Sequence, residues 1–140
     1  MKAILISIKP QYAAAIYAGT KTYELRKCHP NIFVGTPMLI YETSPVKRVT
    51  GMAYYNGTFE DTPLNIWCRL YRWLGITKGA YMEYYKNDSI AYAWQLLKVK
   101  QFTKPMELSD FSISRPPQSY QFIDLSDDFL GYFIAYLMTT

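Results

Sequence analysis

The chain has 140 residues, half of them apolar, which is enough to build the hydrophobic core of one domain. Its fifteen lysine and arginine residues against eleven aspartate and glutamate residues leave a formal charge of +4, a mild bias toward anionic partners. Two cysteines without close spacing and a single histidine are too few ligands for a structural zinc site. We therefore expect reduced thiols, no metal and no cofactor.

Neither end of the sequence has the pattern of a targeting or membrane segment. The apolar stretch before Lys9 is too short for a signal peptide. The longest late apolar run, Phe129 to Met138, is far below the ~20 residues that a membrane span needs. The glycine patterns of P-loop and Rossmann nucleotide sites are also absent. We therefore expect a soluble, cytoplasmic protein with one domain over residues 1–140.

Two predicted elements at the N-terminus lead into a corner of the chain. Residues 3–8 are almost entirely apolar, which predicts a strand covered on both faces. Residues 10–18 predict a short helix, because Pro10 fixes the backbone at the first helical position. Gly19 suits the left-handed conformation that ends a helix, so the chain should turn there.

Three ionisable residues follow this turn within a few positions. Residues 22–27 alternate in polarity, which predicts a strand with Glu24 and Arg26 on one face, and Lys21 precedes them on the helix side. One interpretation is a solvated strand face, where surface ion pairs contribute only ~0–1 kcal/mol. The other is a site where Lys21 and Arg26 hold an anion while Glu24 orients them or accepts a proton.

The middle of the chain predicts paired strands. Residues 38–42 read as one strand, and residues 46–59 read as a longer extended segment. Gly51 should break this segment, and the Asn-Gly pair at residues 56–57 should turn it. Together these signals indicate a β-meander.

A helical insertion follows the meander. Thr62 and Pro63 predict a helix start that should end at Gly75, and Thr77 should cap a second short helix. An aromatic stripe at helical spacing is more often packing than a stacking surface. We therefore assign three aromatic residues of the first helix to the core, namely Trp67, Tyr71 and Trp73.

The last third of the chain predicts two strands and a terminal helix. Residues 89–102 form the longest strand candidate, which residues 104–105 should end. Residues 108–111 predict a short turn or helix, and residues 120–125 predict a last strand. Residues 126–138 predict an amphipathic helix whose apolar face must dock on the domain or on a partner chain.

The charged corner belongs to a longer resemblance. The pattern Gly-x-Lys-x-x-Glu-x-Arg at residues 19–26 resembles the signature of the ASCH domain, a branch of the PUA-like superfamily. Residues 7–13, residues 41–47 and residues 116–120 match further segments of that family in the same order. The resemblance spans residues 4 to about 122. It implies an α+β fold, a small mixed β-barrel with a helix beside a cleft, with the helical insertion and C-terminal helix added to it.

The resemblance and the residue chemistry together select candidate binding residues. Cations would hold phosphate, a polar loop made rigid by prolines would read a base edge, and Tyr23 or Tyr41 could stack on a base. The charge at residues 47 and 48 could equally protect a strand edge from pairing. The candidates are Gly19, Lys21, Glu24, Arg26, Ser44, Lys47, Gln118 and Ser119.

Three functional hypotheses follow. The first is a nucleic-acid-binding module, with RNA or a nucleotide as its partner. The second is a hydrolase, either a ribonuclease or an amidohydrolase of a modified nucleoside such as N4-acetylcytidine, with Lys21 and Glu24 as its catalytic residues. The amidohydrolase branch of the family has a threonine where this chain has Glu24, so Glu24 would serve here as general base while Lys21 stabilises the oxyanion. The third is a homodimer formed through the C-terminal helix.

Overall fold

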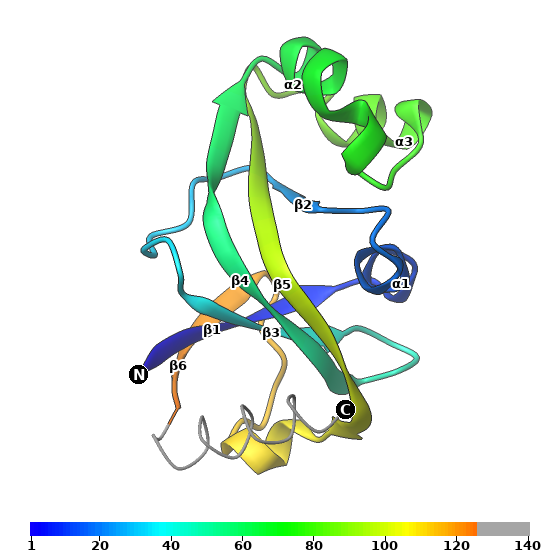
Figure 1. Cartoon of the computed structure of the whole chain (residues 1–140). Helices are drawn as coiled ribbons and strands as arrows, with labels where there is room; N and C mark the ends of the chain where they lie inside the picture. The colour runs from blue at the N-terminus through cyan, green and yellow to red at the C-terminus, as the bar shows by residue number, and fades with distance from the viewer. Residues whose placement is uncertain (126–140) are drawn as a thin grey trace.

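The computed structural model describes residues 1–125 and has a curved sheet with helices packed beside it (Figure 1). The strands are β1 (Lys2–Ile8), β2 (Tyr23–Arg26), β3 (Pro37–Glu42), β4 (Arg48–Asp61), β5 (Ala91–Met106) and β6 (Tyr120–Asp124). The helices are α1 (Pro10–Ala18), α2 (Pro63–Leu70) and α3 (Lys78–Tyr84), with 3-10 turns η1 (Tyr71–Trp73) and η2 (Leu108–Phe111).

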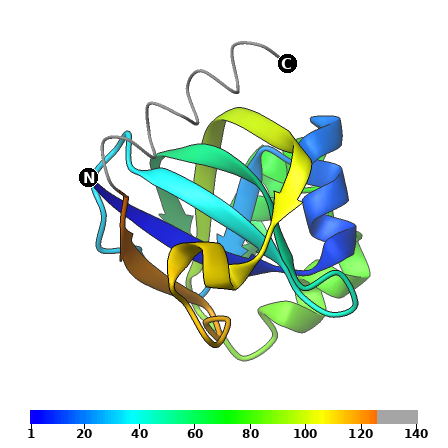
Figure 2. The same ribbon diagram turned by 90° about the horizontal axis from the view of Figure 1, so that it is seen from below.

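The six strands form one mixed sheet in the order β2-β5-β4-β3-β1-β6. The β1 and β3 strands run parallel, and the other neighbours run antiparallel. The expected mixed α+β class is confirmed. Within the described part of the chain β2 and β6 remain the two edges, so the sheet curves without closing and the word barrel applies only loosely. Figure 2 shows this curvature from below, with α1 along one side of the sheet.

The β4 and β5 strands form a long twisted ribbon that carries α2 and α3 at one end (Figure 1). The turn expected at residues 56–57 is wrong, because these residues lie inside β4. Their pairing with β5 shifts register between Tyr55 and Thr58, and Gly57 takes a positive φ of 102° there. An Asn-Gly pair therefore forms a bulge in this strand instead of a hairpin.

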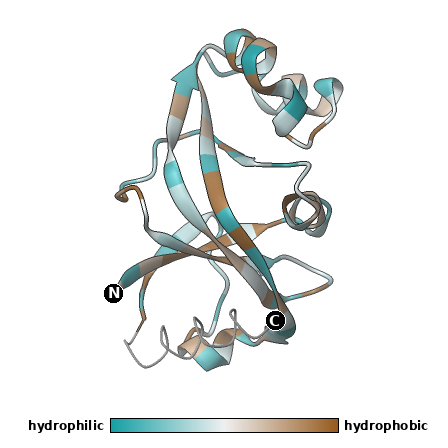
Figure 3. Cartoon of the chain, in the orientation of Figure 1, coloured by the Kyte–Doolittle hydropathy of each residue, from teal (hydrophilic) through white to brown (hydrophobic). Residues whose placement is uncertain are grey.

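The β5 strand also continues past its expected end at residues 104–105. Its register with β4 jumps between Val49 and Gly51, so that Met106 pairs with Val49 again. Pro105 falls in this irregular stretch, where a residue without an N–H group costs no ladder hydrogen bond. Figure 3 shows hydrophobic and hydrophilic residues along the same strand, as the sequence pattern predicts.

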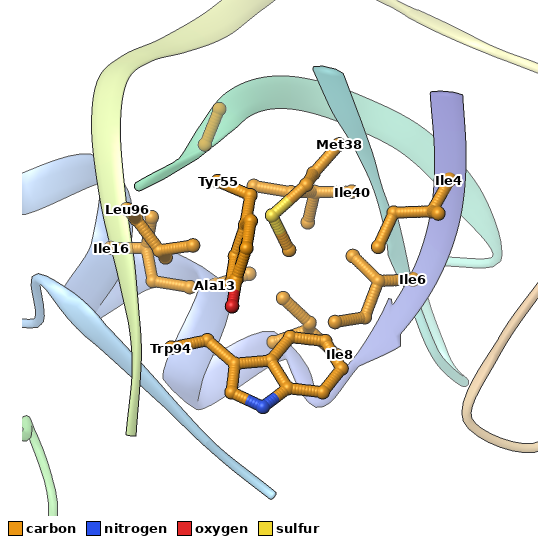
Figure 4. Packing of buried hydrophobic residues seen from close by; sticks show 11 residues of the cluster. Ile4, Ile6, Ile8, Ala13, Ile16, Met38, Ile40, Tyr55, Trp94 and Leu96 are labelled. Atoms are coloured by element: carbon orange, nitrogen blue, oxygen red, sulfur yellow. The ribbon is translucent and has the colours of Figure 1, made fainter. Parts of the chain in front are cut away.

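The main core lies between α1 and the concave face of the sheet. Figure 4 shows isoleucines of β1 and β3 pointing toward Trp94, whose indole is fully buried and donates from Nε1 to the Cys28 carbonyl at 2.9 Å. Burying each large apolar side chain contributes roughly 1.5–3 kcal/mol. The buried members of this cluster are Ile4, Ile6, Ile8, Ala13, Ile16, Met38, Ile40, Ala53, Tyr55, Trp94 and Leu96.

The helical insertion begins as expected. Thr62 accepts a hydrogen bond from the backbone of Asn65, and Thr77 accepts one from the backbone of Ala80, so both predicted caps are confirmed. The α2 helix ends at Leu70, before the expected Gly75, and continues as the tighter turn η1.

This early end of α2 changes which aromatic residues are buried. Trp67 packs on Tyr81 with ring centroids 5.0 Å apart, but Tyr71 and Trp73 are 46% and 51% exposed. Their assignment to the core is therefore wrong. Trp73 follows Tyr71 by two positions, and residues two apart do not share a face of a helix, so the three residues could not all be buried on one side.

The last expected strand is confirmed as β6, which pairs antiparallel with β1. The helix expected at residues 126–138, and the dimer that it would form, lie outside the described residues. No helix among residues 1–125 is long and apolar enough to cross a membrane.

Candidate functional site

A pocket of about 540 Å³ opens where the end of β1, the start of α1, the strand β2 and the helix α3 approach one another. Its volume is within the range of small-molecule and cofactor pockets. Lys21, Glu24, Arg26 and Gln118 line the pocket together with apolar and aromatic residues of α1 and α3. The charged corner predicted from the sequence therefore faces a hollow and not a convex surface.

Lys21 is placed by the end of α1. Gly19 has a positive φ of 82° and turns the chain, after which the Lys21 backbone donates to the Ala15 carbonyl at 3.1 Å. Its side chain is 2% exposed and donates from Nζ to the Leu74 carbonyl at 2.7 Å. The Nζ atom also lies 5.3 Å from the ring centroid of Tyr12. An ammonium group carries three protons, so this environment leaves Lys21 able to donate to a ligand.

Burial is the main electrostatic influence on Lys21. Loss of water lowers its pKa, the negative charge of Glu24 opposes that effect, and the positive charge of Arg26 adds to it. No ion pair links Lys21 directly to Glu24 in the described part of the chain. The ammonium and the carboxylate are therefore separate features of one pocket.

Glu24 is a buried carboxylate with an unused acceptor. Its residue is 7% exposed, and Oε1 lies 3.5 Å from Nε of Arg26. This contact is an ion pair and not a hydrogen bond, since Arg26 Nε has no hydrogen-bond partner among residues 1–125. Oε2 of Glu24 is likewise buried without a partner there. Buried polar atoms without partners are rare and costly, and they are typical of sites completed by a ligand or by water.

Arg26 connects the edges of the pocket. It donates from Nη1 to the Ser119 hydroxyl at 3.0 Å and from Nη2 to the Ser7 carbonyl at 2.8 Å. Its guanidinium carbon lies 5.9 Å from the ring centroid of Trp94. Arg26 thus ties the loop before β6 to the end of β1, which holds Gln118 beside the pocket.

The structure brings together four of the eight candidate residues. Gly19 caps α1, and Ser119 contacts the pocket indirectly through its hydrogen bond with Arg26. Ser44 and Lys47 are exposed in the turn between β3 and β4, next to the pocket residue Thr43. For all eight candidates, a role in binding remains a prediction.

The aromatic residues expected to stack do not face the pocket. Tyr23 is 8% exposed and packs edge-on against Phe59, while Tyr41 is 4% exposed in the core on the other face of the sheet. Tyr12 and Tyr84 line the pocket in their place. The aromatic run in α3 is the signal that could have found Tyr84, but that run predicts packing equally well.

Among residues 1–125, no three histidine, cysteine, aspartate or glutamate side chains lie close enough together to hold a metal ion. Cys28 and Cys68 are exposed free thiols.

A second groove of about 410 Å³ lies between η2 and β6, and it is lined by aspartates and apolar residues without a lysine or arginine. It suits an anionic ligand less well than the first pocket.

Known proteins are similar to this chain in both sequence and fold. The family model described as ASCH domain matches residues 6–106. A protein of Zymomonas mobilis subsp. mobilis named "ASCH domain-containing ribonuclease" is 33% identical over 122 residues, covering 84% of this chain and 82% of that protein. A crystal structure of ASCH from Zymomonas mobilis matches with a TM-score of 0.82 and 27% identity, covering 95% of this chain and 94% of that chain.

Proposed function

This chain belongs to the ASCH domain family, and we propose that it binds single-stranded RNA by holding one unpaired nucleotide in the pocket. The observation that carries this proposal is the convergence of Lys21, Glu24 and Arg26 on one hollow of nucleotide size. The relative named a ribonuclease supports RNA as the polymer.

The cations of the pocket suit a phosphate group. Lys21 is buried beside Arg26, and the exposed Lys9 lines the same pocket. Hydrogen bonds between ionised groups and phosphate are stronger than neutral ones, and a site shielded from water strengthens them further. A phosphate next to Lys21 would also offset the loss of hydration that lowers the pKa of this lysine.

The aromatic side chains suit an unpaired base. Tyr12 and Tyr84 line the pocket, and Tyr84 is 38% exposed, with the Lys27 ammonium 4.7 Å from its ring centroid, so part of its surface remains accessible to a ligand. Stacking of a base on an aromatic side chain contributes roughly 1–3 kcal/mol. A paired base cannot leave its helix to enter such a pocket without cost, which favours single strands.

The test is the salt dependence of binding, measured by fluorescence anisotropy with a labelled single-stranded RNA. The logarithm of the affinity should fall linearly with the logarithm of salt concentration, by ~0.7 for each phosphate neutralised. Lys21→Met should reduce that slope by about 0.7 if Lys21 holds one phosphate. Lys2→Ala is the matched control, because Lys2 is exposed at the opposite end of β1 from the pocket. Binding that is indifferent to salt, or equal for both variants, would refute the proposal.

RNA cleavage is the second candidate function, and the name of the Zymomonas relative favours it. In this reaction Glu24 accepts the proton of a ribose 2′-hydroxyl, and the 2′-oxygen attacks the adjacent phosphorus. The bond from phosphorus to the 5′-oxygen breaks, and that oxygen takes a proton from Lys21, leaving a 2′,3′-cyclic phosphate. Arg26 stabilises the negative charge on the phosphoryl oxygens. The lowered pKa of Lys21 favours its role as proton donor.

Incubation with two substrates distinguishes binding from catalysis. Single-stranded RNA should yield products with 2′,3′-cyclic ends if the chain is a ribonuclease, and N4-acetylcytidine should yield cytidine if it is an amidohydrolase. Glu24→Gln should abolish either turnover, because an amide cannot accept the proton. If the unmodified protein binds RNA but turns over neither substrate, only the binding proposal stands.

A further inference from the structure

We propose that the base held in the pocket is guanine, read by the carboxylate of Glu24. This inference rests on the proposed binding of RNA and adds the identity of the nucleotide. It starts from the buried Oε2 atom of Glu24, which has no hydrogen-bond partner among residues 1–125. The side chain of Glu24 is only 9% exposed, so water has little access to it. A ligand that brings hydrogen-bond donors to this carboxylate would satisfy it.

The neighbouring contacts leave the carboxylate open to two donors. Oε1 lies 3.5 Å from Nε of Arg26, but this nitrogen makes no hydrogen bond with the residues that the structure describes. Lys21 directs its ammonium group to the Leu74 carbonyl. A carboxylate is an acceptor only, with two oxygens side by side, and it therefore selects a ligand edge with two adjacent donors.

Guanine is the one standard base with such an edge. Its N1–H and exocyclic amino group lie side by side and can donate to both carboxylate oxygens. Uracil presents a single N–H between two carbonyl oxygens, which would face the carboxylate oxygens with like charge. Cytosine and adenine each present an amino group next to a ring nitrogen acceptor. Each of these three bases would therefore leave one oxygen of Glu24 facing an acceptor.

The third group on the same edge of guanine also finds a partner. The O6 atom beside N1–H is an acceptor, and Gln118 lines the pocket with an amide that can donate to it. Gln118 follows two consecutive prolines, which restrict the backbone of the loop that carries it. Arg26 donates from Nη1 to the hydroxyl of the next residue, Ser119, at 3.0 Å. The amide is thus presented from a restrained loop.

The experiment measures the affinity of the unmodified protein for five labelled RNAs at one salt concentration. Each RNA is octauridine, either unchanged or with one central uridine replaced by guanosine, inosine, cytidine or adenosine. The RNA with guanosine should bind about tenfold more tightly than each of the others. Inosine is the decisive comparison, because it keeps N1–H and O6 and lacks only the amino group. Equal binding of the inosine and guanosine RNAs, or tighter binding of the cytidine or adenosine RNA, would overturn the inference.

Two variants connect the preference to one side chain. Glu24→Gln replaces one acceptor oxygen by a donor, so the ratio of the guanosine affinity to the octauridine affinity should fall to about twofold or less. Glu60 is exposed on β4 away from the pocket, so the matched control Glu60→Gln should keep the full preference for guanosine. A Glu24→Gln protein that loses turnover but keeps the guanosine preference would assign Glu24 to proton transfer and overturn the inference. If this variant does not fold, the comparison of guanosine with inosine in the unmodified protein decides.

Failure of this inference differs from failure of the proposed function. Salt-dependent binding of all five RNAs with similar affinity retains the RNA-binding function and removes guanine recognition. Absence of binding to every RNA removes both.

Discussion

Replacing Lys21 by methionine should separate the stability of this fold from its function. Lys21 is 2% exposed, and its charge is compensated by one hydrogen bond of 2.7 Å to the Leu74 carbonyl and by the face of Tyr12. Burying an ammonium group costs several kcal/mol, whereas a charged hydrogen bond returns about 1.5–3 kcal/mol. Methionine has a similar length and no charge, but it leaves the Leu74 carbonyl without its donor, at a cost of about 1–3 kcal/mol. These terms nearly cancel, so we expect Lys21→Met to be within about 1 kcal/mol of the unmodified protein, or more stable.

The pH dependence gives this prediction a second, independent readout. Burial lowers the pKa of Lys21 below its ordinary value of 10.5. Between the folded pKa and 10.5 the unfolded chain binds more protons than the folded chain, so the contribution of Lys21 to stability rises with pH through that window. The rise is at most ~1.4 kcal/mol per pH unit. The free energy of unfolding of the unmodified protein, relative to that of the Lys21→Met variant, should therefore increase as the pH rises.

The assay is urea unfolding followed by tryptophan fluorescence, at neutral pH and at about pH 9.5, with RNA affinity measured on the same samples. We expect similar stability at neutral pH, a relative gain of the unmodified protein at the higher pH, and weaker RNA binding by the variant. A variant destabilised by more than about 3 kcal/mol at both pH values would show that Lys21 is a structural residue. Unchanged RNA affinity would show that the buried charge has no part in binding.

Three further changes test the surroundings of the pocket. Gly75 has φ of 58°, and an added Cβ would lie 2.5 Å from Cβ of Lys21. Gly75→Ala should therefore destabilise the fold by about 1–3 kcal/mol in thermal melting and weaken RNA binding in anisotropy. Gly79 has open space around it, so Gly79→Ala should change neither measurement. Burial raises the pKa of Tyr81 to about 12, so the folded chain keeps a proton that the unfolded chain loses near pH 10. The free energy of unfolding should therefore fall as the pH rises from about 10 to about 12. In urea titrations Tyr81→Phe should make this fall shallower by up to ~1.4 kcal/mol per pH unit. Equal slopes for the two proteins would contradict the burial argument. Lys47→Ala should reduce the salt slope of RNA binding by about 0.7 if this exposed lysine contacts phosphate, and an unchanged slope would exclude that contact.

Local signals predicted those parts of the fold whose geometry depends on the nearest residues. Pro10 and Gly19 bound α1, and Thr62 and Thr77 cap the two helices of the insertion, because each acts on backbone groups within one turn of itself. The Asn-Gly pair at residues 56–57 failed as a predictor for the opposite reason. The same pair suits a hairpin turn or a bulge, and the partner strand β5, more than thirty residues later in the chain, decides between them.

The candidate site likewise contains residues that nearby sequence predicted and residues that only long-range packing places. Glu24 and Arg26 alternate along β2 and so share one face, and Lys21 lies just before this strand at the turn after α1, so nearness in sequence was enough to predict that the three lie together. Tyr12 and Tyr84 reach the pocket only through the packing of α1 and α3 against that strand, which no local pattern encodes. Tyrosine is also common in cores, so composition alone could not separate a pocket residue from a buried one.

The helical insertion explains why the sequence pattern around Lys21 is not by itself a site. The insertion supplies the Leu74 carbonyl that accepts from Lys21 and the wall of α3 that excludes water from it. It also brings Gly75 against the side chain of Lys21, an approach that any Cβ would obstruct. On a chain with the same corner and no insertion, the lysine would keep its hydration and act as one more surface charge. The packing of α2, η1 and α3 against the corner therefore turns a solvated strand end into a buried donor in the same pocket as the Glu24 carboxylate.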